Sequence, residues 1–295
     1  MELVRKIKMW IILVLISALL YGIWQVVEKK IVKNVNVYDF LFIQSIFEFT
    51  FGLLLLKYVT LNLNLFLIVI FITGGIIAAI VNVLVIQSLK HSDISAILPL
   101  QNLTPVFLLF VAFIFLNEVP TFLQLFGIIA IIFGTYLISV KSLKSLFTVY
   151  AFAKTKYIIF MIIAAFLMSL LGTIAKYSQS IVNAYTYMFF FVFTLFICNL
   201  FIIILQKRSK KTLKSFKGNY KIIFLAAALI FSSDIFMMKA MQNPIALAIL
   251  IMPIKRMSTL FSTIIGGKLF KEKNLTQKII ACSVMIVGVF FISIG

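Results

Sequence analysis

The stretch QNLTPVFLLFVAFIFLNEVPTFLQLFGIIAIIFGTYLI (residues 101–138) decides the fold class of this chain. It holds two long apolar runs separated by a short turn, Asn117-Glu118-Val119-Pro120. A helix needs about 20 mostly apolar residues to cross the hydrocarbon core of a bilayer. Each run, taken with its flanks as 94–116 and 121–140, has that length. The stretch therefore predicts two consecutive transmembrane helices joined by a tight connection.

Comparable apolar runs fill the rest of the chain. We expect ten transmembrane helices, at 9–30, 38–58, 65–89, 94–116, 121–140, 157–180, 184–205, 221–243, 245–267 and 275–294. Helices are expected because backbone groups inside lipid have no water to bond and must bond within their own segment. The first run is too long for a signal peptide and lacks a small-residue cleavage site after it. The predicted fold class is all-α integral membrane.

The composition is typical of a protein that faces lipid. Hydrophobic residues make up 63% of the chain and charged residues 12%, about half the ~25% of soluble domains. The net charge of +19 falls mostly between the apolar runs, where basic residues orient membrane proteins and contact phospholipid. We therefore expect the bilayer as a partner, no nucleic acid, and a multi-pass location in the cell (cytoplasmic) membrane. Two basic segments, 141–156 and 206–220, are predicted to be surface loops.

No group of residues suggests a metal site or a catalytic centre. Cys198 and Cys282 lie singly in apolar runs, and His91 is the one histidine. Neither cysteine has the spacing of a metal site or a disulfide framework. The sequence also lacks a Gly-rich phosphate loop with Lys and Ser/Thr. We expect no metal, no cofactor, no catalytic residues and no enzymatic activity.

The two halves of the chain correspond weakly but in the same order. Positions 154 residues apart pair Pro99-Leu100-Gln101-Asn102 with Pro253-Ile254-Lys255-Arg256, Glu118 with Glu272, and Gly134 with Gly288. This predicts a first five-helix repeat (1–140), a basic connecting loop (141–156) and a second five-helix repeat (157–295). Because five is odd, the second repeat would enter the bilayer from the opposite face. Such inverted repeats are typical of alternating-access carriers, and a homodimer is left open.

The stretch 101–138 resembles the helix-4-to-5 signature of EamA-type members of the drug/metabolite transporter superfamily. The resemblance rests on Pro105, Glu118, Gln124, Gly127 and Gly134. The stretch 253–293 repeats the signature more loosely, so that the resemblance covers nearly the whole chain. It implies ten helices, a central cavity and transport of small metabolites, without naming the metabolite.

Lys255 and Arg256 are the main candidates for binding substrate. They lie about 15 Å into the ninth predicted helix, too deep to reach the headgroups easily, and an ionised side chain at that depth usually faces a cavity or a partner. The hypothesis is contact with an anionic substrate. The alternative is a structural pair with a carboxylate. Gln101 and Asn102 occupy the repeat-equivalent positions and are expected on the opposite wall.

A second resemblance adds one residue to this site. The Lys255-Arg256 pair is similar to a pair in the organophosphate/phosphate translocators of the same superfamily, which implies a phosphate grip helped by a lysine on helix 6. Lys176 lies on the sixth predicted helix. Because Lys176 is also near the end of that helix, extension of its side chain to the headgroups is the alternative.

Five carboxylates remain to be interpreted. Glu48 and Asp234 lie in mid-helix and are expected to balance the cations or to carry a coupling proton. Glu118 and Glu272 end their helices and are expected to be structural or gating residues. Glu28, near the end of the first predicted helix, is expected at the membrane interface.

These features favour a secondary carrier or exchanger that moves a small polar, anionic metabolite by alternating access. Within transport, the alternative is an exporter of amino acids or amphiphilic drugs. From other classes, the alternatives are a non-transporting membrane scaffold and an enzyme acting on lipid phosphates.

Overall fold

The computed structural model describes residues 2–294 except 33, 61–63, 92–99, 102, 140–155, 208, 259, 263–264 and 266–274. Its elements are α1 (Glu2–Val32), α2 (Val37–Leu54), a 3-10 turn (Leu56–Tyr58), α3 (Leu65–His91), α5 (Thr104–Leu116), α6 (Phe122–Ser139), α7 (Lys156–Gln179), α8 (Ala184–Leu205), α9 (Ser209–Met241), α10 (Ala248–Lys255) and α12 (Leu275–Ile294). The described residues contain no strand, which confirms the all-α prediction. Most of the predicted loop 141–156 lies outside the described residues.

Most of the helices match membrane thickness. Six described segments, in α1, α2, α3, α7, α8 and α9, are long and apolar enough to cross a bilayer. Shorter apolar helices occupy Thr104–Leu116, Phe122–Gly134 and Ser283–Ile292. The chain is therefore a multi-pass membrane protein, and the count of ten transmembrane helices stays a prediction.

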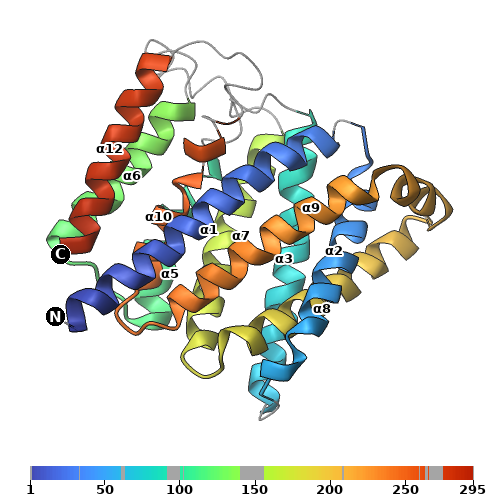
Figure 1. Cartoon of the computed structure of the whole chain (residues 1–295), viewed down its shortest axis with the longest axis horizontal. Coiled ribbons are helices and arrows are strands. Elements are labelled where there is room, and N and C mark those ends of the chain that lie inside the picture. The colour runs from blue at the N-terminus through green and yellow to red at the C-terminus, as the bar shows by residue number, and fades with distance from the viewer. Residues whose placement is uncertain are drawn as a thin grey trace.

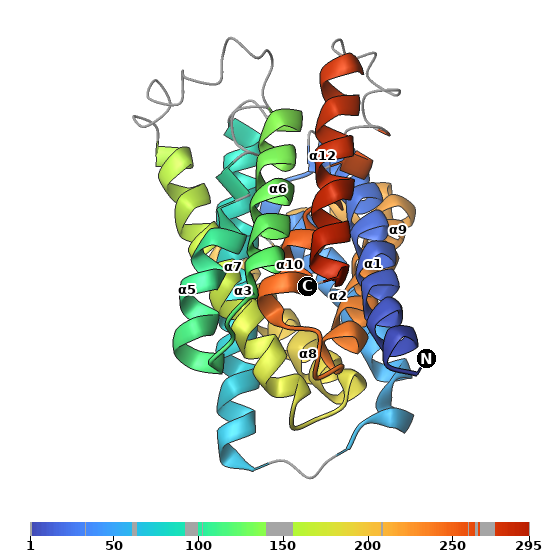
Figure 2. The same ribbon diagram turned by 90° about the vertical axis from the view of Figure 1, so that its left-hand side faces the viewer.

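Eight helices form a closed ring by their contacts. Going round it, α2 packs against α8, then come α3, α7, α5, α10, α1 and α9, which returns to α2. Helices α6 and α12 pack against each other and stand together at one edge of the bundle (Figures 1 and 2), where they join the ring through α10 and α1. The ring has an inside, where buried side chains of different helices meet, and an outer surface.

The order of neighbours around the ring is unchanged when the two halves of the chain are exchanged. Exchanging α1 with α7, α2 with α8, α3 with α9, α5 with α10 and α6 with α12 turns the α1–α9 contact into α7–α3 and the α7–α5 contact into α1–α10. The pairs α2–α8 and α5–α10 are mapped onto themselves, and each of the other neighbour pairs of the ring is mapped onto another pair of the ring. This invariance supports the division into repeats 1–140 and 157–295, which we keep as a proposal.

Two helices are interrupted at positions 154 residues apart. The prediction of one continuous ninth helix (245–267) is wrong, because α10 ends at Lys255 and the chain turns at Arg256 and Met257. Pro253 explains the break, since proline has no N–H to donate and crowds the preceding turn. In the first half, the chain likewise turns at Leu103 before α5 begins at Thr104.

The backbone bonds at the two breaks correspond one to one. The N–H of Leu103 donates to the carbonyl of Leu100, and that of Met257 donates to the carbonyl of Ile254. The N–H of Phe107 donates to the carbonyl of Leu103, and that of Phe261 donates to the carbonyl of Met257. Each residue in these bonds is matched by the residue 154 positions later, the same offset that aligns the sequence halves.

The basic segment 206–220 is only in part a loop. Helix α9 begins at Ser209, so that residues 209–220 belong to its first turns. Lysine is a good helix former because its unbranched side chain loses little rotamer freedom in a helix. The prediction of a loop for these residues is therefore wrong, and the connection from α8 is reduced to 206–208.

Two glycines allow α6 and α12 to cross closely. A Cβ built on Gly127 would lie 2.6 Å from the carbonyl oxygen of Gly288, and one built on Gly288 would lie 2.7 Å from the carbonyl oxygen of Gly127. Such reciprocal backbone contact is possible only without side chains at both positions.

We expect Gly127→Ala to lower the thermal unfolding temperature of the detergent-purified protein. The added methyl group must displace backbone, and overpacking of this kind costs on the order of 1–3 kcal/mol. The matched control is Gly74→Ala, because a Cβ there would meet its nearest atom at an ordinary 3.6 Å. Equal unfolding temperatures for the two variants would contradict the close crossing.

Candidate substrate site at the broken helix

Lys255 and Arg256 lie inside the helix ring, at the break that follows α10. Only 8% of the Lys255 surface and 7% of the Arg256 surface are exposed. Helix α10 is packed against α1, α5, α7 and α9, which hold it within the bundle. The two cations therefore do not reach the headgroup region, and their environment is made by other helices.

The ammonium of Lys255 is held by two helices. Its Nζ donates to the hydroxyl oxygens of Ser17 on α1 (2.7 Å) and Ser233 on α9 (2.9 Å). The hydroxyl of Ser17 also donates to the Ser233 carbonyl at 2.7 Å, and that of Ser233 donates to the Ser17 carbonyl at 2.9 Å. This reciprocal serine pair fixes α1 against α9 and turns oxygen atoms toward the cation. We call Ser17, Ser233 and Lys255 the serine clasp.

Two further groups complete the surroundings of Lys255. Asp234 places Oδ1 3.4 Å from Nζ, which gives a partly buried ion pair between α9 and α10. The ring of Tyr21 on α1 lies 4.9 Å from Nζ, within the range of a cation–π contact. Asp234 is therefore the counter-ion of Lys255 in this structure, as one reading of the sequence predicts.

Arg256 reaches from the second half of the chain to the first. Its Nη2 donates to the Thr104 hydroxyl at 2.8 Å and approaches the sulfur of Met168 at 3.7 Å. Thr104 in turn donates to the carbonyl of Gln101 at 2.8 Å. The Thr104 hydroxyl thus links Arg256 to the backbone of Gln101, and the expectation that Gln101 lines a substrate site stays a prediction. Asn102 lies outside the described residues.

Several buried polar atoms of α1, α2 and the segments at the two breaks have no hydrogen-bond partner among the described residues. They are Trp24 Nε1, Gln25 Oε1 and Glu28 Oε1 on α1, Gln44 Oε1 on α2, Gln101 Oε1, and Ser258 Oγ. Gly22 brings α1 against the segment after the break, because a Cβ there would lie 2.7 Å from the Ser258 carbonyl. An unpaired buried polar group costs about 1–3 kcal/mol. These atoms therefore mark a place where water or a polar ligand completes the bonding.

Glu48 forms a second polar pair on α2. Its Oε1 accepts a hydrogen bond of 2.7 Å from Gln44 Nε2, and both side chains are buried. Helix α2 packs against α9, and Asp234 is close enough to act electrostatically on Glu48. Glu48 thus faces the same helix that supplies the counter-ion, but its described bond is to a neutral amide.

Lys176 takes part in a different contact. Its Nζ donates to the carbonyls of Met241 (2.8 Å) and Asn243 (2.9 Å), at the end of α9. A cation at this position satisfies carbonyl groups that a helix end leaves without partners. The structure therefore ties Lys176 to the α9 terminus, two turns beyond Asp234. It does not join Lys176 to Lys255 through a described bond.

Glu118 joins the two halves at the start of α10. Its Oε1 accepts from the N–H of Ala248 (2.9 Å) and its Oε2 from the N–H of Ile249 (3.1 Å). A carboxylate at a helix N-terminus satisfies free donors and favours the helix dipole. Glu118 thus anchors the short helix that carries Lys255. Glu272, its repeat equivalent, lies outside the described residues.

Sequence reasoning missed four residues of this region, Ser17, Tyr21, Thr104 and Ser233, and misplaced Glu28. A serine within an apolar run is common and gave no signal by itself, whereas Ser233 next to Asp234 could have been noticed. Glu28 was expected at the interface and is instead buried, with 3% of its surface exposed. Its position near the end of the predicted helix 9–30 suggested the interface, but α1 continues to Val32 and is covered by other helices there.

Comparison with known proteins agrees with this architecture. Residues 8–140 match the EamA-like transporter family, which confirms the family expected from the stretch 101–138. Of the solved structures, 27 chains match, among them one given as "Crystal structure of protein". It shares 12% sequence identity with this chain at a TM-score of 0.70, over 96% of this chain and 95% of its own. At this identity it supports the fold alone. No curated protein matches the chain.

We expect Lys255→Met to destabilise the protein, by less than the about 3–5 kcal/mol of a fully buried pair, because it leaves Asp234, whose side chain is 26% exposed, without its cation. Adding Asp234→Asn to Lys255→Met removes the uncompensated charge, so that the double variant should regain much of the loss. Thermal unfolding in detergent measures both. A double variant no more stable than Lys255→Met alone would show that the pair does not matter to the fold.

Proposed function

We propose that this membrane transporter of the drug/metabolite transporter superfamily, whose residues 8–140 match the EamA-like family, is a secondary carrier for a small anionic metabolite. The carrier works by alternating access between repeats 1–140 and 157–295. We place it in the cell membrane. Its substrate site lies at the centre of the helix ring, where Arg256 meets Thr104 and Gln101.

One observation carries the proposal. Arg256 belongs to the second half of the chain, and it donates a hydrogen bond to Thr104 of the first half from inside the ring. Helices broken in mid-membrane are the usual sites of substrate binding in carriers built from inverted repeats. A side chain that bridges the halves at such a break is positioned to sense and to transmit a ligand.

The chemistry of the surrounding atoms favours an anion with several oxygen atoms. Arginine presents planar N–H groups that match carboxylate and phosphate oxygens in pairs. The indole N–H of Trp24 and the hydroxyl of Ser258 are buried and unpaired, and both can donate to such oxygens. The serine clasp supplies a second positive charge beside this group.

The alternating step follows from the same contacts. In the structure, Lys255 is bonded to α1 and α9 and balanced by Asp234. An anion that enters would compete with Asp234 for the cation and weaken the hold of α9 on α10. Because α10 is also anchored to the first half through Glu118, a change in α10 shifts the two halves relative to each other.

A second candidate is export of amino acids, favoured by Glu28. Its Oε1 is buried and unpaired, and the charges of Glu28 and Arg256 both act on Tyr21. A zwitterion could place its carboxylate at Arg256 and its ammonium at Glu28. Binding that requires both charges on the ligand would distinguish this candidate from the anion carrier.

We expect Arg256→Gln to weaken binding of the anion roughly 10- to 100-fold, which corresponds to the loss of a charge-assisted hydrogen bond. The purified parent is first tested for ligand-induced thermal stabilisation with phosphate esters, carboxylates and amino acids. The ligand that stabilises most is then titrated against the variant. Uptake into proteoliposomes loaded with the same ligand measures exchange.

The matched control is Lys239→Gln, which removes a cation of α9 that lies over the Tyr185 ring at 5.1 Å. This variant should bind like the parent. If Arg256→Gln and the control give the same titration curve, the anion site is not at Arg256. If no ligand of the panel stabilises the parent, the carrier proposal loses its support.

We also expect Glu48→Gln to abolish transport driven by a proton gradient while it leaves binding of the anion intact. The amide keeps a hydrogen-bonding side chain beside Gln44 but cannot take up or release a proton. Proteoliposomes of the variant should therefore exchange the anion but no longer accumulate it in response to a pH gradient. Accumulation equal to that of the parent would assign Glu48 a purely structural role.

A further inference from the structure

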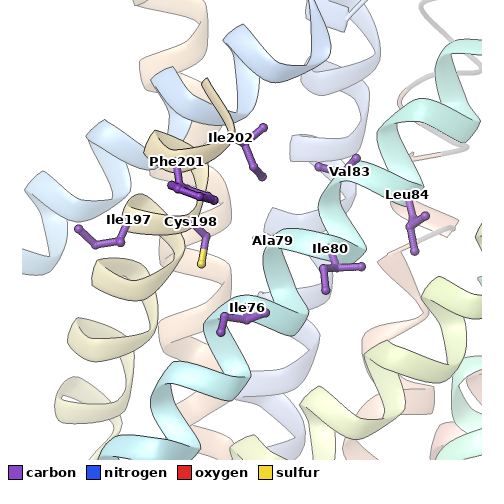
Figure 3. A pocket seen from close by; sticks show the side chains of 9 residues that line it. All are labelled: Ile76, Ala79, Ile80, Val83, Leu84, Ile197, Cys198, Phe201 and Ile202. Carbon is purple, nitrogen blue, oxygen red and sulfur yellow. The ribbon is translucent and has the colours of Figure 1, made fainter. Parts of the chain in front are cut away.

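A groove opens between α3 and α8 on the outside of the ring. Figure 3 shows Ile76, Ala79, Ile80, Val83 and Leu84 of α3 facing Ile197, Cys198, Phe201 and Ile202 of α8. Its volume is about 600 Å³, within the about 300–1,000 Å³ of small-molecule sites. All of its accessible lining is apolar. The groove is therefore deep enough for a ligand and offers that ligand no hydrogen bond.

The groove faces lipid rather than the ring centre. Ile80 and Phe201 on its rim are 46% and 61% exposed. Along α3 the exposed residues Val69, Ile72, Ile76 and Ile80 recur every three or four positions, which defines one outer face of a helix. Ala79, 3% exposed, forms the floor. The ligand must therefore come from the hydrocarbon phase.

One end of the groove lies next to positive charge. Helix α8 ends at Leu205, one turn beyond Phe201, and Lys207 follows in the turn to α9. Lys207 is exposed and has a left-handed backbone with φ 50°. The sequence that follows, RSKKTLKSFK (208–217), carries five more basic residues and no acid. At about 1.5 Å per residue, this charge begins within about 8 Å of Ile202, at the level where headgroups would lie.

We propose that the α3–α8 groove binds an acyl chain of an anionic phospholipid, whose headgroup is held by Lys207. The apolar lining fits the chain, and Lys207 fits the phosphate and its net charge. Clusters of basic residues at the membrane face of a helix are known to retain anionic lipids. The lipid would hold α8 against α3 on the outer surface, and this role does not depend on what the carrier transports.

Cys198 provides a direct probe, because the chain has two cysteines and Cys282→Ala leaves Cys198 alone in the groove. The rate of its alkylation by N-ethylmaleimide is measured in detergent with added phosphatidylglycerol or phosphatidylcholine. At ten times the dissociation constant, a bound lipid slows labelling about tenfold. We expect phosphatidylglycerol to slow the labelling of Cys198 at lower concentrations than phosphatidylcholine does.

Two charge variants test the headgroup contact. Lys207→Gln should bring the protection by phosphatidylglycerol close to that by phosphatidylcholine. Lys57→Gln is the matched control, because Lys57 is exposed and lies at the opposite end of α8, near Asn183. Full retention of the phosphatidylglycerol advantage in Lys207→Gln would overturn the proposal, as would equal protection by both lipids in the parent.

Two tryptophan variants, one that fills the groove and one that does not, test lipid binding through thermal stability and need no labelling. Cys198→Trp should lose the rise in unfolding temperature that phosphatidylglycerol causes in the parent, whereas Ile114→Trp, on the exposed face of α5, should keep it. An unchanged rise in Cys198→Trp would overturn the proposal. So would a covalent dimer formed through Cys198 by a short bifunctional maleimide, because the groove would then be covered by a second copy of the chain.

Discussion

The structure depends on the burial of two positive charges in a ring of membrane helices. An ionised side chain at the centre of a membrane helix costs about 2.5–3.5 kcal/mol on insertion scales. The serine clasp and Asp234 offset that cost for Lys255, since hydrogen bonds to a charged group each contribute about 1.5–3 kcal/mol. The clasp draws its oxygens from α1 and α9, and the charge it holds is on α10. One ammonium therefore requires three helices from both halves of the chain to keep their relative positions.

The breaks in the two helices allow the buried cations of the second half to meet polar groups of the first half. A continuous α10 would keep its backbone groups bonded and turn Lys255 and Arg256 about 100° apart around its axis. The turn at Arg256 and Met257 instead lets Lys255 reach α1 and α9 while Arg256 reaches Thr104. The equivalent turn at Leu103 places Gln101 and Thr104 opposite. The two halves thus contribute unlike side chains, cationic and neutral, at related backbone positions, as expected if a common unit diverged to bind an asymmetric ligand.

Much of this fold could be predicted because the bilayer imposes simple rules on a sequence. Apolar runs of helix length gave the helices, and the offset of 154 residues aligned Pro253 with Pro99. The breaks themselves were not predicted, because the segments 94–116 and 245–267 were read as continuous helices. The extent of α9 was missed because the basic residues 209–220 suggest a loop, although lysine favours a helix. The serine clasp could not be foreseen, because Ser17 and Ser233 are 216 residues apart and only the packing of α1 on α9 joins them. Lys176 shows the opposite limit, since a family resemblance gave it a ligand role and the structure bonds it to two carbonyls.

In the proposed carrier, the space around Arg256 and Gln101 is a passage that opens to each side of the membrane in turn. The most direct measurement places a cysteine at Gln101 in a Cys198→Ser, Cys282→Ser background and treats sealed vesicles with a membrane-impermeant thiol reagent from either face. The account predicts reaction from both faces, slowed from both by the same bound anion. Reaction from one face alone, or protection by no anion that the parent binds, would contradict a substrate site between the two halves.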